Sequence, residues 1–436
     1  MTWQDEYKRK LTSPEKVAQN FQSGDHIGMG GGTGIPPLIA EAIGKRAGEI
    51  TDIKFAQGFA VDFHEYMKPE HKEHFRIETI FIGPAERYCL ELGTCDFVPN
   101  HLGSMAKWAK DFGAKKLAIV VSPPDENGYM NRSLFAGLVP KQLISNCEYV
   151  AVEVNENTPW LFSDDNVYDI HISEIDHIVE NHAPLFEVPE IPITDVEKSI
   201  AKHIVDMIPD GSTVQLGLGG LANCIGHFLK DKKDLGIHSE VVTDSIMELI
   251  KCGAVNGSKK SLLPGKVAYT FAVGTHELHR FLHRNPDFIA FEIAQTNDPY
   301  FIARNDNIIS INNALMVDLT GQVASESIGI RQYSATGGQV NFVLGSQLAK
   351  NGKSLIALPS VRKDREGKIH SRILDVFPAG TTTTTSRNDV EWIVTEYGAV
   401  RLTNKSISER VKLLTSIAHP DFRDELLFKA REHKWL

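Results

Sequence analysis

The apolar residues between positions 194 and 208 recur at helical spacing. Thr194 and Glu197 have the spacing of a capping box, in which two side chains bond the backbone N–H groups that begin a helix. An apolar face follows at intervals of three and four residues, made of Val196, Ile200, Ile204, Met207 and Ile208. After a turn at Gly211, the β-prone run STVQL leads into the loop GLGG and a second apolar segment. This pattern predicts helix, turn, strand, glycine-rich loop and helix, in that order.

The same pattern occurs near the start of the chain. Residues 12–43, TSPEKVAQNFQSGDHIGMGGGTGIPPLIAEAI, also indicate a helix, a turn, a strand, a glycine-rich loop and a helix. Three pairs of glycines coincide when the two copies are aligned: Gly24 with Gly211, Gly30 with Gly217, and Gly32 with Gly219. The two halves of the chain therefore share one plan.

Two later pairs of segments extend the duplication. KKLAIVVSPPDENG is similar to KSLIALPSVRKDREG, and CEYVAVEVNEN is similar to VEWIVTEYGAV, which aligns Glu153 with Glu396. The boundary falls in the proline-rich residues 183–194, so we expect domains at 1–185 and 192–436. Strands that alternate with helices predict an α/β fold with largely parallel sheets. Ligands of such folds bind at the carboxyl ends of the strands, where both glycine loops are expected.

Composition and charge exclude several classes of protein. The chain is 42% hydrophobic and 23% charged, as in globular proteins, with a net charge of −10 and no long basic run, which argues against nucleic-acid binding. No apolar run reaches the roughly 18 residues of a membrane span, and the polar N-terminus has no signal-peptide core. The five cysteines are scattered, without a C-x-x-C pair, so we expect a reduced, cytoplasmic protein without structural zinc or disulfides.

Glu240 is the residue whose type least fits its surroundings. It lies in LGIHSEVVTD, where Ile237, Val241 and Val242 predict a short buried strand, and an ionised carboxylate is costly to bury without a partner. The preceding loop GLGGLA, residues 217–222, fits the dinucleotide fingerprint G-x-G-x-x-G/A, with Glu240 near the position of a ribose-binding acid. These residues leave three readings open: an NAD-dependent dehydrogenase, a plain structural turn, and a loop whose N–H groups bind an anion or oxyanion.

Other biased stretches carry weaker signals. HELHRFLH, residues 276–283, lacks the i, i+4 histidine spacing of zinc proteases, and the histidines at 64–74 indicate a solvated face or a loop. The threonine run at 381–385 predicts an edge strand or turn, without assigned chemistry. YSATGGQVNF, residues 333–342, is a further glycine loop that permits either a turn or close approach of a ligand. Neither G-x-S-x-G nor a phosphate-binding P-loop is present, which disfavours serine hydrolases and P-loop kinases.

Taken together, five separated motifs resemble the acetyl-CoA hydrolase/transferase family, in particular its 4-hydroxybutyrate and butyryl-CoA:acetate CoA-transferase branch. They are VQLGLGGLAN, LGIHSEVVTD, SINNALMVDLTGQVASESIG, YSATGGQVNF and TTSRNDVEWIVTEYG, and the similarity runs along almost the whole chain. The resemblance implies two CoA-transferase-type α/β domains with the active site at their interface. It also implies a homo-oligomer.

The resemblance also implies roles for individual residues. Glu240 matches the nucleophile of the family's H-[ST]-E motif, and Asn312 and Glu396 match other catalytic positions. The two glycine loops would supply oxyanion and CoA contacts, with the N–H groups of Leu218 and Gly338 as donors. Lys363 would contact CoA, and the N-terminal loop would face the acyl pocket. The remaining loop positions are Gly217, Gly219, Gly220 and Gly337 on the CoA side, and Gly32, Thr33 and Gly34 on the acyl side.

The expected activity is transfer of CoA from a short-chain acyl-CoA to a small carboxylate such as acetate. Glu240 would pass through a glutamyl-CoA thioester, with ping-pong kinetics. No resident cofactor or metal is required, because CoA is itself the substrate and part of the covalent intermediate. An acyl-CoA hydrolase on the same scaffold is the nearest alternative. A dehydrogenase and a non-catalytic CoA-binding module are the more distant ones.

Overall fold

The computed structural model describes residues 2–188 and 192–436, which form two compact units. The first unit consists of Met1–Pro189 with Ala268–Thr296, and the second of Glu190–Val267 with Asn297–Leu436. Residues 268–296 therefore group with the N-terminal segment, although the sequence pattern placed them in the second half. Part of the expected boundary at 183–194 lies outside the described residues.

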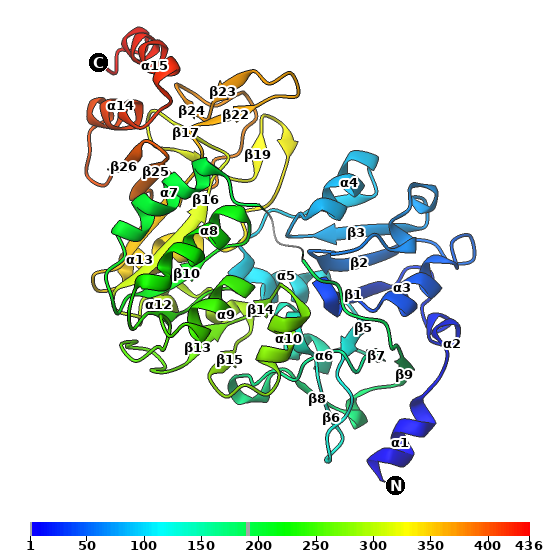
Figure 1. Ribbon diagram of the computed structural model, residues 1–436. Coiled ribbons are helices and arrows are strands. Elements are labelled where there is room, and N and C mark those ends of the chain that lie inside the picture. Colours follow the sequence, from blue (N-terminus) through cyan, green and yellow to red (C-terminus); the bar gives the residue numbers. More distant parts are fainter. Residues whose placement is uncertain (1, 189–191) are drawn as a thin grey trace. The chain divides into compact units, whose positions relative to one another are not determined.

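A seven-stranded parallel sheet forms the centre of the first unit, in the order β4-β3-β2-β1-β5-β7-β9 (Figure 1). Its strands are β1 (His26–Gly31), β2 (Ile53–Gly58), β3 (Phe75–Thr79), β4 (Cys95–Phe97), β5 (Lys116–Val121), β7 (Tyr149–Val154) and β9 (His177–Glu180). The chain runs outward from β1 to β4 and then returns to β5 on the other side of β1. This reversal makes the end of β1 a topological switch point, where ligands of α/β sheets bind.

The helices of the first unit are α1 (Trp3–Lys10), α2 (Pro14–Ala18), α3 (Pro37–Gly44), α4 (Pro84–Leu92), α5 (Met105–Phe112), α6 (Lys141–Ser145), α10 (His276–Leu282) and α11 (Ile293–Thr296). Of these helices, α3 to α6 lie between strands of this sheet, α1 and α2 precede it, and α10 and α11 follow it in the sequence. Short strands complete the unit: β6 (Tyr129–Asn131), β8 (Asp169–His171), β14 (Phe271–Ala272) and β15 (Phe288–Ala290).

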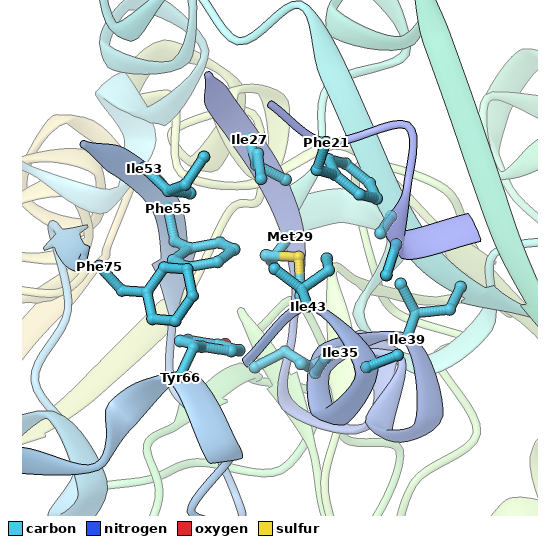
Figure 2. Packing of buried hydrophobic residues seen from close by; sticks show 14 of the residues in the cluster. Phe21, Ile27, Met29, Ile35, Ile39, Ile43, Ile53, Phe55, Tyr66 and Phe75 are labelled. Atoms are coloured by element: carbon cyan, nitrogen blue, oxygen red, sulfur yellow. The ribbon is translucent and has the colours of Figure 1, made fainter. Parts of the chain in front are cut away.

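Alternating apolar residues of β1 and β2 form the core beneath α3. Figure 2 shows Ile27 and Met29 of β1 facing Ile35, Ile39 and Ile43, which lie on and just before α3. Phe55 of β2 stacks on Tyr66, with ring centroids 4.2 Å apart. Burial of these side chains contributes roughly 25 cal/mol for each Å² of apolar surface removed from water. The packing fixes the β1–α3 connection, which is the N-terminal glycine loop.

The second unit repeats this arrangement with a six-stranded sheet in the order β11-β10-β16-β21-β25-β26. Its strands are β10 (Thr213–Leu216), β11 (Gly236–Ile237), β16 (Ile308–Asn313), β21 (Lys353–Ala357), β25 (Trp392–Thr395) and β26 (Gly398–Arg401). All neighbours are parallel except β25 and β26. The strand order reverses between β10 and β16, so the end of β10 is again a switch point.

Helices cover this sheet, and smaller strands flank it. The helices are α7 (Asp195–Asp206), α8 (Gly220–Phe228), α9 (Asp244–Lys251), α12 (Pro299–Ile302), α13 (Gln339–Leu348), α14 (Ile407–Ser416) and α15 (Pro420–Glu432). The smaller strands are β12 (Val241–Val242), β17 (Met316–Asp318), β18 (Val323–Ala324), β19 (Ser327–Ile328), β20 (Arg331–Gln332), β22 (Val361–Lys363), β23 (Ile369–Ser371) and β24 (Ile373–Leu374). The strand β13 (Val267–Tyr269) spans the point where the chain passes from the second unit to the first.

The α/β class and the duplicated pattern are confirmed. Thr194 and Glu197 form the predicted capping box of α7, and Gly24 and Gly211 have similar positive φ angles of 86° and 78°. Two details were wrong. Val196 is 39% exposed and lies off the apolar face of α7, and LGIHSEVVTD forms two short strands, β11 and β12, instead of one.

Candidate active site

Four functional candidates of the second unit lie at the carboxyl ends of its parallel strands. The loop 217–220 follows β10, and Glu240 lies three residues beyond β11. Asn312 is the next-to-last residue of β16, and Glu396 directly follows β25. Because the ends of parallel strands share one edge of a sheet, the fold gathers residues that are far apart in the sequence. This edge is the candidate active site.

Glu240 lies in the break between β11 and β12, at this edge of the sheet. The N–H of His238 bonds the carbonyl of Val214 (3.2 Å), and Ser239 Oγ donates to the carbonyl of Leu216 (2.9 Å). Buried Lys260 donates to the carbonyl of Ile237 (2.8 Å). These bonds hold residues 237–239 to β10 and its surroundings, and the backbone pairing with β10 ends before Glu240. The acid in an otherwise β-prone run therefore stands outside the strand.

Glu240 has one side-chain partner that the sequence did not indicate. Asn297 Nδ2 donates a hydrogen bond to Glu240 Oε2. Burial raises the pKa of Glu240 to about 7, and the bond from Asn297 opposes part of this rise. A buried carboxyl group with such a pKa at the carboxyl edge of a parallel sheet is a candidate for a functional residue.

Gly338 lies against the same carboxylate. A Cβ atom on Gly338 would overlap Oε2 of Glu240 and Nδ2 of Asn297, so only glycine allows this approach. Gly337 has a φ of 58°, which also favours glycine. The loop YSATGGQVNF therefore places its backbone at Gly338 directly against the Glu240 carboxylate.

The loop after β10 presents its backbone at the start of α8. Gly219 precedes the helix with φ 114° and caps it without a side chain, and a Cβ there would meet nothing within 4 Å. Gly217 and Leu218 are partly exposed. N–H groups at a helix start attract anions. Binding of an anion or oxyanion by this loop stays a prediction, because the same backbone geometry also serves a plain turn.

Asn312 and Glu396 bond groups other than Glu240. Asn312 Nδ2 donates to Gln215 Oε1 at 3.4 Å, whereas the Glu240 carboxylate accepts its hydrogen bond from Asn297. Glu396 accepts bonds from the N–H and Oγ of Ser360, at 2.8 and 2.6 Å. Ser360 thereby orients both carboxylate oxygens of Glu396.

Lys363 belongs to the antiparallel hairpin of β22 and β23 and is exposed. It pairs with Ile369, while its neighbour Arg362 pairs with His370 and points to the other face of the ribbon. The hairpin also carries Arg365 and Lys368, so it is a basic segment in an acidic chain.

In the first unit, the loop of Gly32, Thr33 and Gly34 follows β1 at the switch point of its sheet. Gly32 has a φ of 50° and donates its N–H to the carbonyl of Phe59 (2.8 Å), while the Phe135 ring occupies the space of a Cβ. A cavity of about 30 Å³ lies beside the end of β1, and its lining includes Gly30, Gly31, Gln57, Met105 and Trp108. Gly34 lines a separate cavity of about 10 Å³, and neither cavity is lined by Gly32 or Thr33.

No candidate metal site emerges from the described residues, in which no three His, Cys, Asp or Glu side chains are grouped to hold an ion. His276 and His279 lie together on α10, and His276 Nε2 is 2.9 Å from the carbonyl of Leu185. Over the same residues, no helix combines the length and apolar character needed to cross a membrane.

Two family profiles match the chain and together cover most of it. The acetyl-CoA hydrolase/transferase N-terminal domain matches residues 1–190, and the C-terminal domain of that family matches residues 274–430. The chain belongs to the acetyl-CoA hydrolase/transferase family. The resemblance inferred from the sequence motifs is thereby confirmed.

Individual family members are similar over their full lengths. The 4-hydroxybutyrate coenzyme A transferase of Clostridium kluyveri is 38% identical, over 99% of this chain and 100% of that protein. The butyryl-CoA:acetate CoA-transferase of Anaerostipes caccae is 35% identical, over 99% and 98%. The crystal structure of RipA from Yersinia pestis superimposes with a TM-score of 0.94 at 34% identity, covering all of both chains. The CoA-transferase-type fold is thus confirmed.

Proposed function

We propose that this protein transfers CoA from a short-chain acyl-CoA to a small carboxylate, with Glu240 as the nucleophile. Butyryl-CoA, 4-hydroxybutyryl-CoA and acetyl-CoA are the proposed donors, and acetate is the proposed acceptor. The observation that carries the proposal is the contact of Gly338 and Asn297 with the Glu240 carboxylate. The names of the similar proteins supply the class of substrate.

The proposed reaction balances without a proton or a cofactor. An oxygen of ionised Glu240 attacks the acyl-CoA carbonyl, the C–S bond breaks, and a mixed anhydride and CoA thiolate form. The thiolate attacks the Glu240 carbonyl of the anhydride, which gives glutamyl-CoA and releases the first acid. The acceptor carboxylate then attacks glutamyl-CoA, and the two steps run in reverse. The carboxylate of Glu240 is regenerated, as covalent catalysis with ping-pong kinetics requires.

Backbone N–H groups suit the tetrahedral intermediates of every step. We propose the N–H groups of Leu218 and Gly338 as the donors, because each belongs to a glycine loop at this edge of the sheet. Losing one such donor typically costs about 3 kcal/mol of transition-state stabilisation. Asn297 would hold Glu240 in its attacking orientation. Glu396, fixed by Ser360, and Asn312 complete the proposed set as supporting residues.

One experiment separates transfer from its rivals. The protein is incubated with butyryl-CoA without an acceptor, and its intact mass is measured before and after acetate is added. We expect a CoA-sized adduct that acetate discharges as acetyl-CoA. Release of free CoA by water alone, without acetyl-CoA, would indicate a hydrolase. Binding without any adduct or turnover would indicate a CoA-binding module, and nicotinamide turnover would indicate a dehydrogenase.

The rate of adduct formation is expected to rise with pH through about 7. Only ionised Glu240 attacks, and its pKa is raised to about 7. The single-turnover rate of butyrate release, which accompanies adduct formation, should therefore increase about tenfold per unit below this pH and level off above it. Asn297→Ala removes the bond that favours the ionised form, so its profile should move to higher pH. A flat profile between pH 5.5 and 8.5 would contradict this assignment.

The same titration has the opposite sign for stability. An unfolded glutamate ionises near 4.5, whereas folded Glu240 keeps its proton to about 7. The folded state therefore binds more protons within this window, and the contribution of Glu240 to the free energy of unfolding falls as pH rises through it. Glu240→Gln should remove this component from the pH dependence of denaturant unfolding.

Lys363 is proposed to contact a phosphate of CoA. Lys363→Gln is expected to raise the Michaelis constant for acyl-CoA about two- to fivefold, the effect of one exposed ion pair, and to leave that for acetate unchanged. Salt should diminish the difference, because exposed charges are screened. Lys350→Gln is the control, since Lys350 is an exposed lysine paired with Asp306 (3.6 Å). Equal Michaelis constants for acyl-CoA in both variants would remove Lys363 from the site.

The remaining parts of the proposal concern the setting of the enzyme. All five cysteines are free, three of them buried, as is usual for proteins of a reducing compartment, which supports a cytoplasmic location. A homo-oligomer rests on the family resemblance.

A further inference from the structure

The threonine run at 381–385 pairs with Val323, in the segment that precedes the loop YSATGGQVNF. The N–H of Thr384 bonds the carbonyl of Val323 (2.8 Å), and the N–H of Val323 bonds the carbonyl of Thr385 (3.1 Å). Thr385 is fully buried, and Thr384 nearly so. Buried hydroxyls need partners. The Thr385 hydroxyl bonds Gln339, which follows Gly338, and the Thr384 hydroxyl bonds Glu326.

The first connection fixes the residue that follows Gly338. Gln339 Nε2 donates to Thr385 Oγ1 at 3.0 Å, and both side chains are buried. Gln339 is the first residue of α13, so this bond anchors the start of the helix directly after the two glycines.

The second connection fixes the residue that precedes Gly337. Oε2 of Glu326 accepts hydrogen bonds from Thr336 Oγ1 (2.7 Å) and from Thr384 Oγ1 (3.1 Å). Glu326 is 4% exposed, and its backbone carbonyl also accepts the N–H groups of Tyr333 and Ser334 (2.7 and 2.9 Å). The threonine run and Glu326 thus hold both ends of the Gly337–Gly338 segment.

We propose that Thr384, Thr385 and Glu326 are positioning residues that keep the backbone of Gly338 against Glu240. The inference rests on the proposed transferase function, because it assigns these residues to the geometry of that same site. None of the three is itself bonded to Glu240 in the hydrogen bonds of the described chain; they act through Thr336 and Gln339.

Hydrogen bonds on both sides of Gly337 and Gly338 limit the conformational freedom of these two glycines. Two consecutive glycines have more conformational freedom than any other pair, yet a backbone donor must stand within a fraction of an ångström of its oxyanion. A misplacement of about 1 Å can cost about 100-fold in rate. Anchors on Thr336 and Gln339 restrict the two glycines without placing a side chain in the space that Glu240 occupies.

The test compares valine and serine at position 385. Thr385→Val keeps the shape but removes the hydroxyl, and kcat for butyryl-CoA with acetate should fall roughly 10- to 100-fold, with the Michaelis constants nearly unchanged. Thr385→Ser keeps the hydroxyl and should restore most of the rate. Thr383→Val is the matched control, because exposed Thr383 belongs to the same run but bonds Gln322 Oε1 (3.3 Å). Thermal unfolding of each variant shows whether a rate loss follows stability.

A second variant keeps the test independent of folding at one buried position. Thr336→Val removes the link to Glu326 from the loop side and should reproduce the fall in kcat. The proposal is overturned if Thr385→Val and Thr336→Val turn over within twofold of the unaltered protein. It is also overturned if serine fails to rescue, or if Thr383→Val loses as much activity. If the unaltered protein transfers no CoA and forms no adduct, the proposed function fails instead, which is a distinct outcome.

Discussion

Replacement of Glu240 by glutamine is expected to abolish CoA transfer. Glutamine keeps the size of the side chain and its contact with Asn297, but its amide cannot form the mixed anhydride. Loss of a covalent nucleophile costs roughly 10⁴- to 10⁶-fold in kcat, so the residual rate should lie near background. The measurement is acetyl-CoA formation from butyryl-CoA and acetate, together with intact mass, which should show no CoA adduct.

Two comparisons make this result specific. Glu240→Asp retains a carboxylate but withdraws it by one methylene from Gly338 and Asn297, so it should form the adduct slowly. Glu248→Gln removes a partly exposed carboxylate of α9, which pairs with Lys230 and Lys251 (both 3.6 Å), and should leave transfer unchanged. A Glu240→Gln variant that still transfers CoA at more than a hundredth of the normal rate would remove Glu240 as nucleophile.

The parts of the fold that sequence predicts are those governed by local rules. The capping box of Thr194 and Glu197 and the positive φ angles of Gly24 and Gly211 depend on a few neighbouring residues. Strands β5 and β21 follow from short apolar runs that end at proline. The parallel direction of the strands then follows from the repetition of strand, loop and helix, because parallel neighbours need crossover connections. Local chemistry therefore predicted the glycine loops and the strand ends that carry the site.

The break before Glu240 does not follow from local pattern. Ile237, Val241 and Val242 have the composition of one strand, and all three are buried as expected. The backbone pairing with β10 ends at the bond from the His238 N–H to the Val214 carbonyl, and beyond it Ser239 bonds Leu216 through its side chain. Such tertiary contacts override β propensity.

Asn297 was missed for a related reason. It lies 57 residues from Glu240, in the stretch AQTNDP, whose only evident signal is a helix start at Asp298 and Pro299. Asn312 lies at the end of the readily predicted strand β16, which made it the candidate favoured by the sequence, but its amide bonds Gln215. Asn297 is the first residue after the chain passes from the first unit back to the second, so its closeness to Glu240 depends on the whole fold and not on local sequence.

Replacement of Gly338 by alanine is expected to have the second largest effect. Gly338 has a φ of −96°, which alanine adopts without strain, so the consequence comes from contact alone. The added Cβ would overlap Glu240 Oε2 and Asn297 Nδ2, and the loop or the carboxylate must move by at least an ångström. Because such a displacement typically costs about 100-fold, kcat should fall by at least this factor, measured as acetyl-CoA formation.

The control for Gly338 is a glycine whose replacement strains the backbone but touches nothing. Gly253 has a φ of 83° and no atom within 4 Å of a built Cβ. Gly253→Ala should therefore lower the free energy of unfolding by about 1 kcal/mol, through its left-handed conformation, while transfer stays normal. Gly338→Ala should lower the free energy of unfolding by about 1–3 kcal/mol through the overlap of its Cβ with the Glu240 carboxylate, and in contrast to Gly253→Ala it should also lose most of its kcat. Normal turnover in Gly338→Ala would mean that this loop does not contact Glu240 during the reaction, and the proposed oxyanion donor would then have to come from the Gly217–Gly220 loop alone.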